Sequence, residues 1–157
     1  MNRTNLYIFD LDGTLADIAH RRPLLEDKTN KNRWLEFFDA CDKDKPNFPV
    51  IKTLNSLVLQ GNEVWIWSGR SDKAKEKTVT WLKEHCFTFS FSFNNIALKM
   101  RQAGDFTPDN ILKKQWLDEM SPEDRQRLVA VFDDRQRLVD MWRDNGIACF
   151  QVAKGDF

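Results

Sequence analysis

The sequence predicts an α/β protein in which helices cover both faces of a doubly wound, mostly parallel sheet. Short apolar runs alternate with helix-length amphipathic stretches along most of the chain, which is the order expected of such a sheet. The apolar runs are continuous rather than alternating, as in strands that are buried on both faces. With 157 residues, 41% of them hydrophobic, the chain has the size and apolar content of one packed domain.

Four apolar runs are predicted to be strands of this sheet: residues 6–9, 64–67, 128–132 and 147–152. The first three end in Asp or in Ser-Gly, which indicates polar loops at one edge of the sheet. Phenylalanine at every second position of residues 87–93 predicts a further strand whose Phe side chains face the core.

Four helices are predicted over residues 49–60, 71–84, 107–120 and 135–145. Pro49 suits a first helical turn, and Ser71 suits an N-cap. Gly61 and Gly146 follow the first and last of these helices, where glycine commonly ends a helix.

Residues 17–48 depart from the alternation and are predicted to form a small helical cap inserted after the first strand. Five residues are expected on one face of its helix: Trp34, Leu35, Phe37, Phe38 and Cys41. Residues 20–33 are locally basic, and a solvated surface is favoured over a gate that meets nucleotide phosphates. For Trp34 and Phe38, packing of the cap on the body is favoured over stacking against a base.

The charge of the chain limits the kinds of partner that it is expected to bind. Lys plus Arg and Asp plus Glu both number 24, so a long footprint on duplex DNA or on an anionic membrane is not expected. A partner that is bound only at one end or at one phosphate group is compatible with this charge.

The three cysteines form no CxxC pair, and the apolar runs are too short to span a membrane. The chain is therefore predicted to be cytoplasmic, without a zinc site or disulfides.

The most distinctive motif, Asp10-Leu11-Asp12-Gly13-Thr14, follows the first predicted strand. The carboxyl end of a parallel strand is where such sheets bind ligands. Asp10 and Asp12 are two residues apart, so an extended backbone points both carboxylates the same way. Gly13 permits a sharp turn. The motif therefore predicts a functional site rather than a simple turn.

Two further motifs follow other predicted strands. Ser68-Gly69-Arg70 combines a hydroxyl, a glycine and a helix N-terminus, which suits a phosphate cradle. Asp133-Asp134 places adjacent carboxylates at a buried strand end, which is costly unless a cation is near. Binding of a hard metal ion is therefore favoured over a solvated turn.

Helical periodicity separates two neighbouring lysines. Lys113 shares a face with Leu117, whereas Lys114 aligns with Asp118. We therefore expect Lys113 to point inward, toward the carboxylates, and Lys114 to pair with Asp118 at the surface.

The motifs DLDGT, SGR, Lys113 and FDDR resemble, in this order, the four motifs of haloacid-dehalogenase-like phosphatases. Residues 101–105, 133–135, 141–143 and 150–157 extend the match, so that nearly the whole chain is similar to the 3′-phosphatase half of phage polynucleotide kinase. The resemblance implies a single domain over residues 1–157, with the cap at about 17–48. No G-x-x-x-x-G-K-[ST] motif occurs, so no kinase domain is expected in this chain.

The resemblance also implies roles for these residues. Asp10 would be the nucleophile that forms an aspartyl-phosphate, and Asp12 the general acid and base. Mg²⁺ would be held by Asp10, the backbone carbonyl of Asp12, and Asp134, with Asp133 in support. Residues expected to contact the phosphate are Thr14, Ser68, Gly69, Arg70, Arg101 and Lys113.

The implied substrate is the 3′-phosphate of a DNA or RNA end, and the implied location is the cytoplasm, that of the host if the chain is phage-encoded. The alternative within the same chemistry is a nucleotidase that acts on free (deoxy)nucleoside monophosphates, which the zero net charge favours. A phospho-accepting receiver domain is a rival of another class. Receiver domains usually have paired acids after the first strand and the acceptor Asp in the middle of the chain, which is the opposite of the order in this sequence. A binding module without turnover is disfavoured because every motif position is intact.

Overall fold

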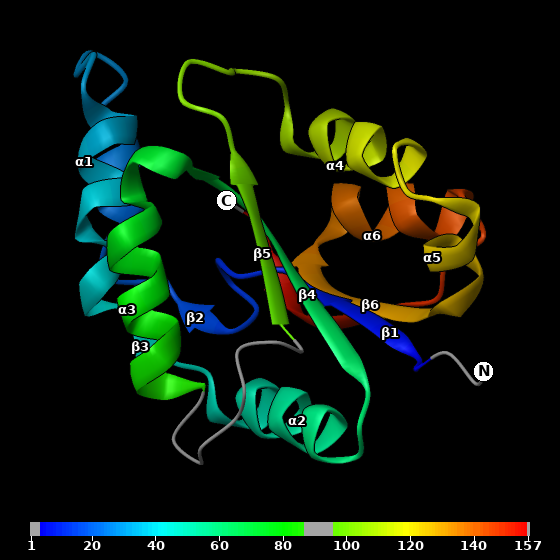
Figure 1. The fold of residues 1–157 in the computed structure, drawn as a ribbon. Coiled ribbons are helices and arrows are strands. Elements are labelled where there is room, and N and C mark those ends of the chain that lie inside the picture. Colours follow the sequence, from blue (N-terminus) through cyan, green and yellow to red (C-terminus); the bar gives the residue numbers. More distant parts are fainter. Residues whose placement is uncertain (1–3, 87–95, 157) are drawn as a thin grey trace.

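The computed structural model describes residues 4–86 and 96–156 and contains a five-stranded parallel sheet in the order β5-β4-β1-β6-β7 (Figure 1). Its strands are β1 Leu6–Phe9, β4 Glu63–Ser71, β5 Ile96–Arg101, β6 Leu128–Arg135 and β7 Cys149–Gly155. The first strand in the sequence lies at the centre, so the chain winds outward in both directions. The predicted doubly wound α/β class is confirmed.

Helices cover both faces of the sheet. α2 (Phe48–Leu59) and α3 (Lys75–His85) pack on one face, and α4 (Asp109–Asp118) and α6 (Gln136–Asp144) on the other. Neighbouring residues of β1 serve opposite faces: Phe9 belongs to the first core cluster and Ile8 to the second. This is the alternation expected of a strand buried on both sides.

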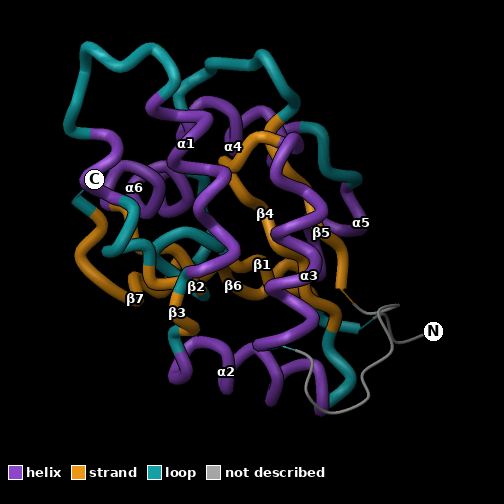
Figure 2. The backbone as a smooth tube through the Cα atoms, turned by 90° about the vertical axis from the view of Figure 1, so that its left-hand side faces the viewer, coloured by secondary structure: helices purple, strands orange, loops and turns teal. Residues whose placement is uncertain are grey.

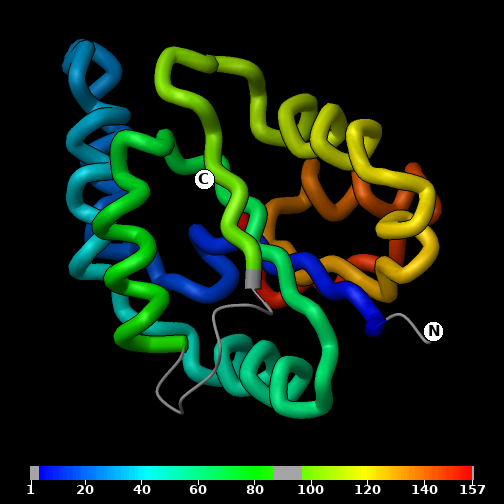
Figure 3. The backbone as a smooth tube through the Cα atoms, viewed as in Figure 1, coloured from blue at the N-terminus to red at the C-terminus, as the bar shows by residue number. Residues whose placement is uncertain are grey.

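The insert after β1 is a two-stranded antiparallel ribbon with short helices between its strands (Figure 2). In chain order it contains β2 Ala16–Asp17, the 3-10 helix η1 Arg22–Leu25, α1 Arg33–Asp39, the 3-10 helix η2 Ala40–Lys43, and β3 Lys45–Pro46. It lies beside α3 (Figure 3), to which it is joined by a hydrogen bond from Trp81 Nε1 to the Asp44 carbonyl, 2.8 Å long. The insert therefore packs against the rest of the protein through α3.

The apolar residues of the insert do not share one face, contrary to the prediction. Phe37 and Cys41 are buried, whereas Trp34 and Leu35 are 47% and 55% exposed. Helix α1 has only seven residues, so one side can pack on the body while the other remains open.

The ribbon strands β2 and β3, the edge strand β5 and helix α5 were not predicted. β5 is an edge strand whose Lys99 and Arg101 interrupt its apolar pattern, because an edge strand is only partly covered. Helix α5 (Pro122–Arg127) was not predicted because it is short. Its start could have been recognised, since Ser-Pro commonly begins a helix. Ser121 caps it by accepting a hydrogen bond from Asp124 N at 3.1 Å. The predicted strand over 87–93 lies outside the described residues. Over the described ranges, no helix is both long and apolar enough to cross a membrane.

Candidate active site

The site lies at the carboxyl ends of β1 and β6, where the sheet brings three acidic side chains together. Asp10, Asp133 and Asp134 are buried, and each offers an oxygen within 4.8 Å of the others. The two strands are neighbours in the sheet, so motifs more than 120 residues apart in the sequence meet at one edge.

Two glycines make room for the Asp134 carboxylate. A Cβ atom at Gly13 or at Gly155 would overlap its Oδ2 atom. Gly13 also has a φ of +84°, a conformation that other residues rarely adopt. The glycine of the first motif is thus required both for the turn and for the carboxylate beside it.

Helix α4 places a lysine against these acids. Lys113 Nζ lies 2.6 Å from Asp10 Oδ1 and 3.2 Å from Asp133 Oδ2, and the residue is 3% exposed. Lys114 instead pairs at the surface with Asp118, at 2.5 Å. The predicted helical register is confirmed.

The cluster has more negative than positive charge. Burial raises the pKa of Asp10 well above its usual range, and the charges of Asp133 and Asp134 add to this, against the opposing effect of Lys113. Burial and the Asp133 charge raise the pKa of Asp134 to about 6. The carboxylates outweigh the effect of burial on Lys113 and raise its pKa above the ordinary value.

This charge imbalance fits a divalent cation. Three buried carboxylates face one ammonium group, and hard oxygen donors are the ligands of Mg²⁺, Mn²⁺ and Ca²⁺. A bound cation would favour the ionised forms of Asp10 and Asp134, whose pKa values are raised in its absence. The donor set and its charge therefore match a metal site formed by Asp10, Asp133 and Asp134.

Thr14 and Ser68 do not contact the cavity in the way predicted for phosphate ligands. The fully buried Thr14 hydroxyl lies 3.2 Å from Asp10 Oδ2 and 3.3 Å from Asp134 Oδ1, so it orients the carboxylates. Ser68 Oγ accepts a hydrogen bond from Arg70 N at 3.1 Å and is also buried. The Thr14 hydroxyl therefore holds the carboxylates in place, and the Ser68 oxygen holds the backbone at the end of β4.

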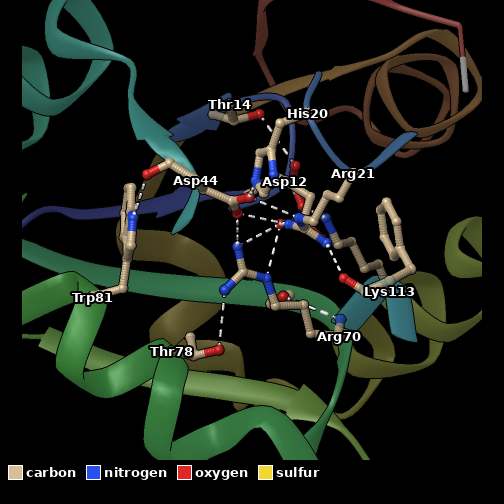
Figure 4. A network of polar contacts seen from close by, with 12 residues as sticks. Asp12, Thr14, His20, Arg21, Asp44, Arg70, Thr78, Trp81 and Lys113 are labelled. Atoms are coloured by element: carbon tan, nitrogen blue, oxygen red, sulfur yellow. Dashed lines mark hydrogen bonds and ion pairs between the residues drawn. The ribbon is translucent and has the colours of Figure 1, made fainter. Parts of the chain in front are cut away.

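Arg70 also differs from its prediction. Its guanidinium is wholly buried and binds Asp12, Asp44 and Thr78 (Figure 4). It therefore lies behind Asp12 and is not presented to a substrate phosphate. The reason is the buried carboxylate of Asp44, which draws the guanidinium away from the cavity.

Arg101 and Gly69, by contrast, line the cavity. Arg101 donates hydrogen bonds to the carbonyls of Gly69, Asp105 and Thr107 at 2.9, 3.2 and 2.5 Å. Its position thus fixes the loop after β5 as well as lining the cavity.

Asp12 is held by two arginines. Arg21 Nη2 lies 2.6 Å and Arg70 Nε 2.8 Å from Asp12 Oδ1. Burial raises the pKa of Asp12, but the charges and hydrogen bonds of Arg70 and Arg21 outweigh it, so this pKa ends below the ordinary carboxyl value.

Sequence reasoning missed Arg21 and Asp44. Arg21 belongs to the basic run that was predicted to be solvated, yet it is 0% exposed. Its partner Asp44 lies 23 residues further along the chain, and its Oδ1 atom is 2.7 Å from Arg21 Nε. No local pattern signals this pair, because the ribbon of β2 and β3 is what brings them together.

The carboxylates form one wall of a cavity of about 550 Å³. Its other walls include Trp34, Phe38 and the 89% exposed Phe106. Besides Arg101 and Lys113, four further basic residues line it: Lys31, Lys73, Arg135 and Arg137. Asp109, at the start of α4, holds two of them, pairing with Arg135 and, at 2.7 Å, with Arg137.

Comparison with known proteins agrees with this geometry. The family model of the polynucleotide kinase PNKP phosphatase domain matches residues 4–157. Two chains solved in the Pnkp1/Rnl/Hen1 complex, in one case described as an RNA repair complex, superpose with TM-scores of 0.74 and 0.73 at 32% identity. They are covered to 49% and 45% of their length, and this chain to 100%.

Two further proteins are less similar to this chain. A protein of Autographa californica nuclear polyhedrosis virus, named for polynucleotide kinase and RNA ligase activities, is 27% identical over 136 residues, which are 86% of this chain and 17% of that protein. The class C acid phosphatase from Bacillus anthracis superposes with a TM-score of 0.62 at 13% identity over 99% of this chain and 70% of that one, a likeness of fold alone. The chain spans less than half the length of its Pnkp1 and viral relatives. It belongs to the polynucleotide kinase PNKP phosphatase domain family, and is thus a haloacid-dehalogenase-like phosphatase, a phosphoric monoester hydrolase.

Proposed function

We propose that this phosphatase removes the terminal 3′-phosphate from nucleic-acid ends in a Mg²⁺-dependent reaction through an aspartyl-phosphate on Asp10. The observation that carries the proposal is the Lys113 ammonium, 2.6 Å from Asp10 within a cluster of three buried carboxylates. A carboxylate held against a cation at the wall of an open cavity is placed to act as a nucleophile.

In the first step, an Asp10 oxygen attacks phosphorus, the bond from phosphorus to the 3′-oxygen breaks, and Asp12 gives that oxygen a proton. Lys113 offsets negative charge on the transferring oxygens. Mg²⁺, when held by Asp10, Asp134 and the Asp12 carbonyl with Asp133 in support, supplies positive charge against the repulsion between carboxylate and phosphate.

In the second step, Asp12 takes a proton from water, the water oxygen attacks phosphorus, and Asp10 leaves as a free carboxylate. Inorganic phosphate is the product. Because Asp12 is ionised in the free site, as its lowered pKa indicates, the proton that it donates in the first step comes from solvent once the phosphate dianion is bound, and the proton that it takes from water in the second step returns to solvent.

The cavity walls support a nucleic-acid end as the substrate. Trp34 and Phe106 offer exposed aromatic surface, on which bases stack without regard to sequence. Lysine and arginine side chains line the same cavity, so the neutral chain presents a locally basic surface near its acids. The likeness to chains of an RNA repair complex makes RNA ends part of the proposal.

A substrate panel tests the proposal. The protein is assayed with 3′-phosphorylated DNA and RNA oligonucleotides, their 5′-phosphorylated counterparts, and free 3′- and 5′-monophosphates, and phosphate release is measured. We expect the highest kcat/KM for the 3′-phosphorylated oligonucleotides. Equal or higher kcat/KM for free monophosphates would favour the nucleotidase alternative, for which a cavity of about 550 Å³ is also large enough.

A further inference from the structure

Asp44 is a buried acidic residue of the insert with no role in the steps proposed above. It follows η2 and precedes β3, and its side chain is 0% exposed. A buried carboxylate is costly unless it is fully paired, so its partners indicate why it is there.

Asp44 binds both arginines that hold Asp12 (Figure 4). Arg21 contacts it with two nitrogens, Nε to Oδ1 and Nη2 to Oδ2, each at 2.7 Å. Arg70 Nη2 lies 2.8 Å from Asp44 Oδ2. His20 Nε2 adds a contact to Oδ1 at 2.8 Å. Two carboxylates and two guanidinium groups thus form a closed network in which charges balance.

The network selects one oxygen of Asp12. Among the described residues, the hydrogen bonds from Arg21 and Arg70 both end on Oδ1, and Asp12 itself lines the cavity. Oδ2 is therefore the oxygen available for proton exchange. Without Asp44, the two forked guanidinium groups would have Asp12 as their one carboxylate partner in the part of the chain that the structure describes, and they could engage both of its oxygens.

We propose that Asp44 is a positioning residue through which the insert holds Arg21 and Arg70 so that Asp12 presents one free oxygen for proton transfer. This inference rests on the proposed function, in which Asp12 protonates the leaving oxygen. The insert then does more than border the substrate cavity, because it also supplies the anchor of the proton donor.

The test uses the leaving group. In the first step, the bond from phosphorus to the 3′-oxygen breaks, a bond from phosphorus to Asp10 forms, and the proton of Asp12 moves to the 3′-oxygen. An oligonucleotide with bridging sulfur in place of the 3′-oxygen leaves as a thiolate, which is stable without that proton. A change in the ratio of the two single-turnover rates between a variant and the wild type therefore reports a change in proton donation.

Both substrates are reacted with excess full-length chain and Mg²⁺, and dephosphorylated product is separated on gels. General acid catalysis is typically worth about 10²–10⁴ in rate, so we expect Asp44→Asn to lower the oxygen-to-sulfur rate ratio by about tenfold or more. Because both substrates meet the same enzyme, partial unfolding cancels from the ratio. Asp39→Asn is the matched control: this insert carboxylate is 73% exposed and pairs with Lys77, and its ratio should equal that of the wild type.

An unchanged ratio in folded Asp44→Asn protein would overturn the inference. Should that variant not accumulate in folded form, Trp81→Phe decides, since it keeps an aromatic ring and removes the hydrogen bond to the Asp44 carbonyl together with part of the buried indole; a lowered ratio supports the link and an unchanged one overturns it. Failure of the wild type to hydrolyse a 3′-phosphorylated end would instead refute the proposed function, so the two failures are distinct.

Discussion

At the scale of single residues, the contact between Asp10 and Lys113 joins the two groups on which the proposed reaction depends. It connects β1 to α4, and both side chains are almost fully buried. The hydrogen bond to Lys113 leaves the other oxygen of Asp10 near Thr14. A change at either residue therefore alters charge at the reacting centre, whereas the core beneath the site is untouched.

Asp10→Asn should abolish turnover, because an amide cannot form the acyl-phosphate. The melting temperature should change little, since Lys113 keeps its contact with Asp133 and one of three crowded charges is removed. Phosphate release and thermal unfolding are measured on the same preparation. A rate near that of the wild type would refute the proposed nucleophile.

Lys113→Ala should lower kcat by about 10²–10³, or roughly 3–4 kcal/mol, the usual effect of losing one preorganised electrostatic contact. Lys114→Ala is its matched control, because the exposed pair with Asp118 contributes only about 0.2–0.5 kcal/mol to helix stability. Both variants are assayed at saturating substrate after their melting temperatures have been compared. Greater damage from Lys114→Ala would contradict the assignment.

At the scale of elements, helix α1 has two unlike sides. Phe37 is buried, and Arg21 lies over its ring at 4.2 Å, whereas Trp34 and Leu35 are about half exposed. All three line the cavity. The buried side of the helix thus supports Arg21, and the exposed side is open to a substrate.

Trp34→Ala should raise KM for a 3′-phosphorylated oligonucleotide while leaving kcat nearly unchanged, because stacking on one base is worth about 1–3 kcal/mol. Leu35→Ala removes a similarly exposed apolar side chain that has no aromatic face, and it should raise KM less. Steady-state kinetics on the oligonucleotide provide the comparison. Equal effects of the two changes would argue against base stacking.

At the scale of the whole molecule, the acidic cluster links stability to metal and pH. Asp10 belongs to the central strand and Asp133 and Asp134 to its neighbour, so repulsion among them opposes the closure of the sheet edge. A cation that binds only the folded chain stabilises it by mass action.

In chelator, the stability of the metal-free chain should fall as pH rises from about 4 to about 6–7. The pKa of Asp134 is raised from 3.8 to about 6 by folding, so the folded state binds the proton more tightly and loses this advantage once pH passes the folded value. Melting temperatures of the wild type and of Asp134→Asn are recorded across this range. The variant should show a smaller fall, and equal slopes would contradict the assignment to Asp134.

Chelation should eliminate activity, and Mg²⁺ or Mn²⁺ should restore it, because both suit hard oxygen ligands. Ca²⁺ should raise the melting temperature without restoring much turnover, since its larger shell places the reacting groups differently. Asp134→Asn should weaken both metal responses. Full activity in excess chelator would exclude a metal-dependent reaction.

The sequence by itself determined the fold class, the insert after the first strand and the register of Lys113. These are local properties: an apolar run, a charged interruption or a helical spacing can be recognised within a few residues. It also indicated that Asp10 and Asp133 would meet, because parallel strands end at one edge. The edge strand β5 was not predicted from the sequence, since partial exposure weakens the apolar pattern of a strand.

Only the tertiary structure decided how the site is supported. Arg21 and Arg70 are separated from Asp44 by 23 and 26 residues, and nothing in the local sequence distinguishes a buried arginine from a solvated one. Thr14 and Ser68 turn toward carboxylate and backbone for the same reason. A buried polar group must find partners wherever the packed chain places them, and that placement depends on the order of the strands and on how the insert packs against α3.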